Sequence, residues 1–325
     1  MNNSDKTNNL FHSLKVPNAF LVGVHYNGTE VQLAENLLYE LASLTRNIGL
    51  QITGSILVRL NVITPRYLLG TGKTQEIISL AKEHNADCII IDAELTPSQQ
   101  RNWEKLSGLC AIDRHEVILE IFAAHASTRE AVLQVGLARM EYSLPRLKRA
   151  WTHLSRQRGG LRGTRGEGEA QLEVDRRIVL RKIDRMKKEL AKVHLQRALR
   201  RKQREKFDLP TASFVGYTNA GKSSLLNRLS DSKVLVEDKL FATLDPTTRR
   251  IELDNGQNLL LTDTVGFIRK LPHDLIDAFK STLEEVVLSD FLILVLDASS
   301  PEITEHYTTT MAVLRELEAA DKPII

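Results

Sequence analysis

The octapeptide GYTNAGKS at residues 216–223 constrains the fold of this 325-residue chain more than any other feature. It matches the phosphate-binding pattern G-x-x-x-x-G-K-S, follows the apolar stretch TASFV and leads into SLLNRLS, so it predicts a strand, a loop and a helix. Glycines let backbone N–H groups turn onto phosphate oxygens at a helix N-terminus, and the lysine adds a positive charge. The sequence therefore predicts a P-loop α/β domain that binds a nucleotide.

Two further segments predict a domain that switches with the γ-phosphate. The sequence DTVG at 263–266 ends the predicted strand NLLLTD, where an aspartate can hold Mg²⁺ and a glycine amide can sense the γ-phosphate. Between the two motifs lies FATLDPTT, in which we choose Thr243 as the threonine that closes over the metal, with Thr247 and Thr248 as rivals. Loops of this kind are ordered by the γ-phosphate and released by its hydrolysis.

These motifs assign roles to individual residues of a Mg²⁺-dependent nucleoside triphosphate hydrolase. We expect the metal to be held by Ser223, Thr243 and Asp263, and catalysis to depend on Lys222, Thr243 and Gly266. The residues expected to bind the nucleotide are Gly216, Tyr217, Thr218, Asn219, Ala220, Gly221, Lys222, Ser223, Ser224, Asp263 and Gly266.

The residue after DTVG is Phe267, where a Ras-like protein has a glutamine that orients the attacking water. A phenyl ring cannot hydrogen-bond water. We therefore expect slow intrinsic hydrolysis that a partner or a bound cation stimulates.

The motif N-K-x-D, which reads guanine, is expected after the next strand, and the chain ends at DKPII, where that strand begins. We therefore interpret residues 207–325 as a GTPase domain truncated at its C-terminal end. The residues present do not choose between guanine and adenine.

Strands alternate with helical patterns over residues 18–125, which predicts an N-terminal parallel α/β domain preceded by a disordered tail at 1–17. A second phosphate-like sequence, GTGKT at 70–74, has Tyr67 where the full pattern needs glycine. We interpret it as a turn that opens a helix, with a nucleotide site as the less favoured alternative.

Several features predict a cytoplasmic protein, although they leave peripheral membrane association open. The N-terminus has no apolar signal core, and the longest apolar runs are far shorter than the ~20 residues of a membrane span. Two cysteines cannot form a disulfide framework, and Cys88 lies in an apparent buried strand, where a core thiol is expected.

Apolar residues at alternating spacings of three and four predict two successive helices within residues 126–206. The first is interrupted by Pro145, and the glycine- and arginine-rich stretch at 156–170 separates it from the second. We expect an antiparallel helical hairpin with this stretch as its tip loop, a basic linker after it, and a monomeric chain; a dimeric coiled coil is the alternative. The apolar positions are Leu133, Leu137, Met140, Leu144, Leu147, Trp151 and Leu154, then Val179, Ile183, Met186, Leu190 and Val193.

The hairpin region is strongly basic, although the net charge of the chain is only +3. Residues 145–206 contain 21 Lys plus Arg against 7 Asp plus Glu, a local excess of +14 that leaves −11 for the rest. Clustered cations gain affinity for polyanions by releasing counterions. We expect Arg158, Arg162 and Arg165 to contact RNA; a solvated helix face is the alternative.

Nearly the whole chain resembles the HflX family of ribosome-associated GTPases. The resemblance is carried by four stretches in this order: GGLRGTRGEGEAQLEVDRR, GYTNAGKSS, FATLDPTTR and DTVGFIRKLP. The resemblance implies GTP as substrate, Mg²⁺ as cofactor, and binding to the large ribosomal subunit and its RNA, with the hairpin tip near the peptidyl-transferase centre. It implies GTP-linked splitting or rescue of stalled ribosomes. In several GTPases of this wider class an asparagine at the place of Asn219 accompanies K⁺. The tip differs from the family pattern at Glu167 and Ala170.

Two other functions remain open from the residues. One is a non-enzymatic fragment that binds RNA or the ribosome. The other is a GTPase of ribosome maturation or RNA modification, which shares the switch machinery but has a different target.

Overall fold

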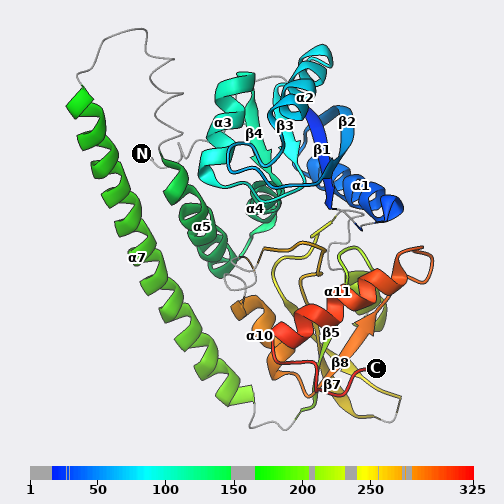
Figure 1. Cartoon of the computed structure of the whole chain (residues 1–325). Helices are drawn as coiled ribbons and strands as arrows, with labels where there is room; N and C mark the ends of the chain where they lie inside the picture. The colour runs from blue at the N-terminus through cyan, green and yellow to red at the C-terminus, as the bar shows by residue number, and fades with distance from the viewer. Residues whose placement is uncertain are drawn as a thin grey trace. The chain divides into compact units, whose positions relative to one another are not determined.

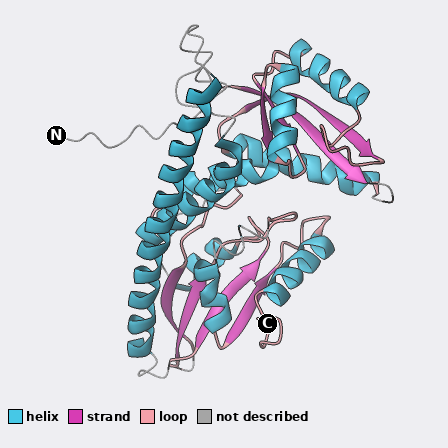
Figure 2. Ribbon diagram, turned by 60° about the vertical axis from the view of Figure 1, so that its left-hand side comes forward, coloured by secondary structure: helices cyan, strands magenta, loops and turns pink. Residues whose placement is uncertain are grey.

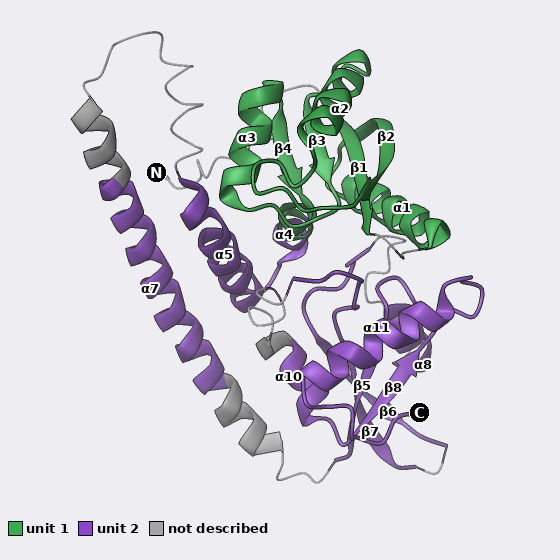
Figure 3. Ribbon diagram, viewed as in Figure 1, with its two compact units in different colours: residues 1–120 green, residues 121–325 purple. Residues whose placement is uncertain are grey.

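The computed structural model describes residues 17–26, 28, 30–147, 165–204, 209–230, 240–254, 256–272, 275 and 280–325. It divides into two compact units, residues 1–120 and 121–325 (Figure 3). This single boundary groups the helices after residue 121 with the P-loop domain. The division into three domains at 125/126 and 206/207 therefore stays a prediction, and the expected tail lies outside the described residues except for Pro17.

The first unit contains a four-stranded sheet with the order β2-β1-β3-β4, in which all neighbouring strands are parallel (Figure 1). The predicted N-terminal parallel α/β domain is confirmed. Its elements are β1 (Asn18–Tyr26), α1 (Val31–Asn47), β2 (Gln51–Leu60), α2 (Thr71–Glu83), β3 (Cys88–Ile91), α3 (Pro97–Ser107) and β4 (Cys110–Asp113), followed by α4 (Arg114–His125).

The central strands of this sheet are buried on both faces, as expected for continuous apolar runs in a parallel sheet. Cys88 in β3 is buried and stands in register with Cys110 of β4, and neither cysteine forms a disulfide bond. Cys88 is thus the core thiol that its strand predicts.

The second unit contains a sheet with the order β6-β7-β5-β8, in which only the edge pair β6–β7 is antiparallel (Figure 2). On one face Val215 packs with Leu283 of α10 and Val313 of α11, and on the other Phe214 packs with Leu226 of α8. Helices therefore cover both faces, as in a P-loop α/β domain. Its elements are β5 (Thr211–Gly216), α8 (Lys222–Ser230), β6 (Thr247–Glu252), β7 (Asn258–Asp263), α10 (Lys280–Leu288), β8 (Phe291–Val295) and α11 (Ile303–Glu316).

The helices α5 (Arg129–Ser143) and α7 (Arg165–Arg204) form the predicted antiparallel hairpin. Glu130 near the start of α5 lies 3.9 Å from His194, whereas Glu141 near its end pairs with Lys187 at 2.7 Å. Residues later in α5 thus pair with residues earlier in α7, so the two helices are antiparallel. The less exposed positions follow the predicted spacing, with Leu137 and Ile183 only 8% and 7% exposed.

Pro145 ends the first helix as predicted, because α5 stops at Ser143 and the 3₁₀ turn η1 (Leu144–Arg146) contains the proline. The predicted tip loop is wrong over residues 165–170, which belong to α7. A glycine inside a helix costs only about 1 kcal/mol, so two glycines there do not prevent a 40-residue helix. Residues 156–164 of the predicted loop, together with Trp151 and Leu154, lie outside the described residues.

None of the helices in the described part of the chain is both long enough and apolar enough to cross a membrane.

Candidate nucleotide-binding site

The phosphate loop joins the end of β5 at Gly216 to the start of α8 at Lys222, so backbone amides at a helix N-terminus face the site. Gly221 has φ 93°, in the left-handed region that favours glycine, and Asn219 has φ 60°. Gly216 has φ 149° and a second reason to be glycine, because an added Cβ would lie 2.3 Å from the carbonyl oxygen of Val295. The first glycine of the motif thus allows β8 to approach, and the later one shapes the loop.

Lys222 is buried, and its ammonium donates hydrogen bonds to the carbonyl oxygens of Gly216 at 3.3 Å and Tyr217 at 2.7 Å. Burial lowers the pKa of Lys222 to about 8, although the charge of Asp263 opposes the shift. A phosphate group would supply the negative charge that favours the protonated lysine.

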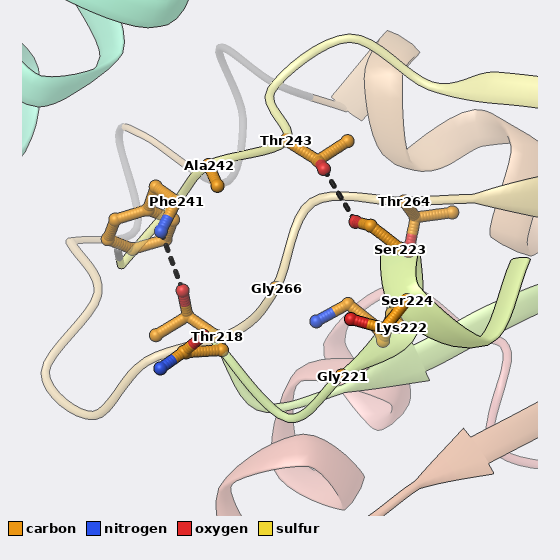
Figure 4. Close-up of a pocket in the computed structure, with 11 residues that line it drawn as sticks. Thr218, Gly221, Lys222, Ser223, Ser224, Phe241, Ala242, Thr243, Thr264 and Gly266 are labelled. Carbon is orange, nitrogen blue, oxygen red and sulfur yellow. Dashed lines mark hydrogen bonds between the residues drawn. The ribbon is translucent and has the colours of Figure 1, made fainter. Parts of the chain in front are cut away.

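Two of the three predicted metal ligands, Ser223 and Thr243, line the pocket (Figure 4), and the third, Asp263, is hydrogen-bonded to Ser223. Ser223 Oγ lies 2.8 Å from Thr243 Oγ1 and donates to Asp263 Oδ2 at 2.5 Å. The second carboxylate oxygen, Asp263 Oδ1, is buried without a hydrogen-bond partner. The residues that line the pocket are Thr218, Asn219, Gly221, Lys222, Ser223, Ser224, Phe241, Ala242, Thr243, Thr264 and Gly266.

This cluster fits Mg²⁺, which prefers a few hard oxygen ligands and keeps several of its waters. Burial raises the pKa of Asp263, while the hydrogen bond from Ser223 and the charge of Lys222 oppose the rise. A buried carboxylate whose charged form is disfavoured is stabilised by a divalent cation. Two hydroxyls and one carboxylate with an unpartnered oxygen are suited to that role.

Gly266 and Phe267 bring the segment after β7 against the phosphate loop. The amide of Thr218 donates to the carbonyl oxygen of Phe267 at 2.7 Å, and the amide of Phe267 donates to that of Gly216 at 3.1 Å. An added Cβ on Gly266 would lie 2.5 Å from Thr218 Cα, so only glycine permits this approach. The Phe267 side chain is 1% exposed and packs in the core with Val215.

The two rival threonines are placed elsewhere. Thr247 begins β6, and Thr248 Oγ1 lies 2.9 Å from Thr262 Oγ1 on the neighbouring strand β7. Of the three candidates, the structure therefore brings Thr243 to Ser223.

The second glycine-rich sequence opens a helix, as predicted. Gly70 is the N-cap of α2, and Lys73 pairs with Glu76 at 2.8 Å on the surface.

Sequence reasoning missed the contacts of two residues of FATLDPTT that flank Thr243. The amide of Phe241 donates to Thr218 Oγ1 at 2.7 Å (Figure 4), and Asp245 accepts hydrogen bonds from Ser127 and Thr128. Burial alone would raise the pKa of Asp245, but the hydrogen bonds from Thr128 and Ser127 prevail and lower it. Only the aspartate before a proline could have suggested such a turn-anchoring role.

The candidate RNA contacts are not placed. Arg158 and Arg162 lie outside the described residues, and Arg165 begins α7 without a described side chain.

Three family models match consecutive parts of the chain. They are described as GTP-binding GTPase N-terminal (residues 35–123), GTP-binding GTPase Middle Region (125–204) and 50S ribosome-binding GTPase (211–325). A curated relative from Akkermansia muciniphila, GTPase HflX, is 56% identical over 95% of this chain and 72% of its own length. The chain belongs to the HflX family of GTPases. It is therefore a P-loop GTP hydrolase.

Other relatives agree with this placement. The HflX GTPase of Magnetococcus marinus is 48% identical over 87% of this chain and 66% of its own length. A solved structure of the protein SsGBP in complex with GDP is 28% identical, covers 95% of this chain and 81% of that one, and has a TM-score of 0.50. The chain thus spans about two thirds of the length of several HflX relatives, and the GTPase fold that it shares with them binds guanine nucleotides.

Proposed function

We propose that this HflX-family chain acts as a Mg²⁺-dependent GTPase that binds the large ribosomal subunit. In this proposal, GTP binding and hydrolysis drive the splitting or rescue of stalled ribosomes in the cytoplasm. The observation that carries it is the cluster of Ser223, Thr243 and Asp263 beside Lys222, in the segment that matches a 50S ribosome-binding GTPase model.

Each residue has a role that follows from its contacts. Lys222 would place its ammonium against the β- and γ-phosphates, and amides of the loop from Tyr217 to Ser224 would donate to phosphate oxygens. Ser223, Thr243 and Asp263 would hold Mg²⁺, which when bound neutralises charge that develops on the phosphates. The Gly266 amide would sense the γ-phosphate.

Slow hydrolysis is part of the proposal. The Phe267 side chain lies in the core, so it cannot orient water at the γ-phosphate. A ribosomal group or a cation must supply that function. A K⁺ ion near Asn219, which lines the pocket, is one candidate.

Exposed cations on α7 support an RNA partner. Arg176, Arg181, Lys182 and Lys192 are exposed along this helix. Clustered surface cations favour phosphate backbones through counterion release.

The decisive experiment is GTP turnover with and without purified large ribosomal subunits, each in K⁺ and in Na⁺. We expect turnover to rise with subunits. No stimulation would overturn the ribosomal part of the proposal. Equal turnover in K⁺ and Na⁺ would remove the K⁺ site alone.

The RNA contact is tested separately by replacing Arg158, Arg162 and Arg165 with alanine. We expect weaker subunit binding and a shallower salt dependence, because each phosphate contact contributes about one unit to the slope. Unchanged affinity would exclude the arginines as RNA contacts.

Accumulation of precursor particles in a deletion strain, instead of unsplit ribosomes, would favour a maturation role.

A further inference from the structure

The segment 240–246, which carries Thr243, is attached to the rest of the second unit on both sides of that threonine. Phe241 lies two residues before it and Asp245 two residues after it. Neither side chain belongs to the set that would hold the metal. Both reach the corner where α4 ends and α5 begins.

Asp245 caps the start of helix α5 from outside that helix. Its Oδ2 accepts hydrogen bonds from the amide of Ser127 at 3.1 Å, the hydroxyl of Ser127 at 2.7 Å and the amide of Thr128 at 3.0 Å. Its Oδ1 accepts a short hydrogen bond from the Thr128 hydroxyl. Thr128 is itself the N-cap of α5 and accepts from the Ala131 amide at 3.2 Å. A carboxylate at a helix N-terminus satisfies free amides and also interacts favourably with the helix dipole.

Phe241 forms the second attachment. Its ring is buried and meets that of Phe122 in α4 edge-on, with the ring centroids 4.8 Å apart and the planes at 81°. Its amide donates to Thr218 Oγ1 in the phosphate loop at 2.7 Å. Its φ of 59° is a left-handed conformation that a bulky residue adopts only when its surroundings impose it.

With both ends fixed, Thr243 lies between the attachments with its hydroxyl 2.8 Å from Ser223 Oγ. We propose that Phe241 and Asp245 are positioning residues, which hold Thr243 at the metal site by anchoring its segment to the α4–α5 corner. The inference rests on the proposed function, because it assumes that the site takes Mg²⁺ and a guanine nucleoside triphosphate. It adds that the start of α5 and the triphosphate stabilise one another.

This role has a selective consequence. Thr243 matters for a nucleotide whose γ-phosphate and Mg²⁺ draw the segment over the site, and a diphosphate lacks that γ-phosphate. Loss of the anchor should therefore weaken triphosphate binding and leave diphosphate binding in place. The coupling is reciprocal. If triphosphate binding stabilises the N-terminal end of α5 by a given factor, stabilising that end should tighten triphosphate binding by the same factor.

The test uses the whole chain and its Asp245→Ala variant. Affinities for GDP and for a non-hydrolysable GTP analogue are measured at several Mg²⁺ concentrations. We expect the analogue to bind about tenfold more weakly to the variant, within the range of typical coupling between sites, with a matching rise in the Mg²⁺ requirement. GDP affinity should change less than about twofold, because its contacts stay intact.

Four further variants separate positioning from a general structural role. Asp254→Ala removes an exposed carboxylate from the turn between β6 and β7 and should change neither affinity. Asp245→Asn keeps one acceptor oxygen and should restore part of the analogue affinity. Thr128→Ala removes only the hydroxyl contact with Asp245 Oδ1 and should weaken analogue binding less than Asp245→Ala does. The double variant Asp245→Ala/Thr128→Ala should bind the analogue no more weakly than Asp245→Ala, because Asp245→Ala already removes that contact.

Hydrogen exchange provides a second measurement that does not depend on turnover. In the unmodified chain the GTP analogue should slow exchange of the amides at 127–131 more than GDP does, and in Asp245→Ala this difference should disappear. Equal weakening of GDP and analogue, or no weakening at all, would overturn the positioning role while leaving the proposed function standing. An unmodified chain that binds neither nucleotide would overturn the proposed function, and this inference with it.

Discussion

Ser223 donates a hydrogen bond to Asp263 through one carboxylate oxygen, at 2.5 Å, and the other oxygen of Asp263 is buried with no hydrogen-bond partner. Only one of the two carboxylate oxygens of Asp263 therefore has a hydrogen-bond partner. Burial raises the pKa of Asp263, so its charge destabilises the fold when no cation is present.

The first prediction concerns that charge. Asp263→Asn should remove Mg²⁺-dependent stabilisation and reduce turnover by at least about 100-fold, because a ligand that balances charge at the phosphates is lost. In EDTA the variant should be as stable as the unmodified chain or slightly more stable, since an uncompensated buried charge is gone. Chemical denaturation with and without Mg²⁺ measures both effects. Asp254→Asn is the exposed control, and a Mg²⁺ response that survives in Asp263→Asn would exclude Asp263 as a ligand.

The two glycine-rich loops should respond differently to the same change. Lys222→Ala should abolish measurable nucleotide binding, because the buried ammonium at the loop is lost. Lys73→Ala should leave binding unchanged and cost less than about 1 kcal/mol in stability, since it removes a surface ion pair. Equilibrium binding of a fluorescent guanine nucleotide compares them. A nucleotide defect in Lys73→Ala would reopen the case for a site at residues 70–74.

Phe267→Gln tests whether the missing glutamine can simply be restored. Phe267 packs with Val215, Leu283 and Val286, so an amide there is buried and a core contact is lost. We expect a loss of roughly 3–5 kcal/mol in the free energy of unfolding, the range for deleting a buried aromatic ring, with no gain in hydrolysis. Phe267→Leu should cost much less. Faster turnover at unchanged stability would show that position 267 can reach the water.

The packing of α7 against α5 can be tested by replacing a buried and an exposed isoleucine of α7. Ile183 is 7% exposed and Ile178 is 46% exposed, both on α7. Ile183→Ala should destabilise by about 2–4 kcal/mol through lost burial and a cavity, and Ile178→Ala by less than about 1 kcal/mol. Urea titrations followed by circular dichroism distinguish them. Equal losses of stability in the two variants would mean that α7 does not pack against α5 through Ile183.

The pH dependence of the core thiol is set by burial, which raises the pKa of Cys88 from 9.0 to about 12. Because the thiolate is the reactive form, Cys88 should resist alkylation at pH 8.5 in the folded chain and react after unfolding. The unfolded chain loses this proton near pH 9 and the folded chain only near pH 12. The contribution of Cys88 to stability is therefore full below about pH 9 and is lost as the pH rises toward 12. Cys88→Ala should flatten this slope; rapid labelling of native Cys88 would contradict its burial.

The sequence predicted those parts of the fold in which one local pattern decides the outcome. The phosphate loop, the break at Pro145 and the turn at Gly70 each follow from a pattern within a few residues, and the parallel first sheet follows from strands that alternate with helices along residues 18–125. The start of α7 was placed too late because glycine is a weak helix breaker, and i,i+4 pairs such as Arg177 with Glu173 add support.

The site was only partly predictable, because its decisive contacts join distant parts of the chain. Sequence order selects Ser223 and Asp263, but the choice of Thr243 over Thr248 depends on where β6 begins. The partnership of Asp245 with Thr128 joins residues 117 apart. Nothing in the local sequence of either residue indicates the other.

The burial of Phe267 also bears on how this protein can change over generations. A polar residue at that position would have to appear together with compensating substitutions around Val215 and Leu283, since alone it would damage the core. Single-step mutation therefore gives no ready route to a self-sufficient hydrolase. Under the proposed function, the rate at which the switch resets would then evolve mainly through the ribosomal group or cation that completes the site.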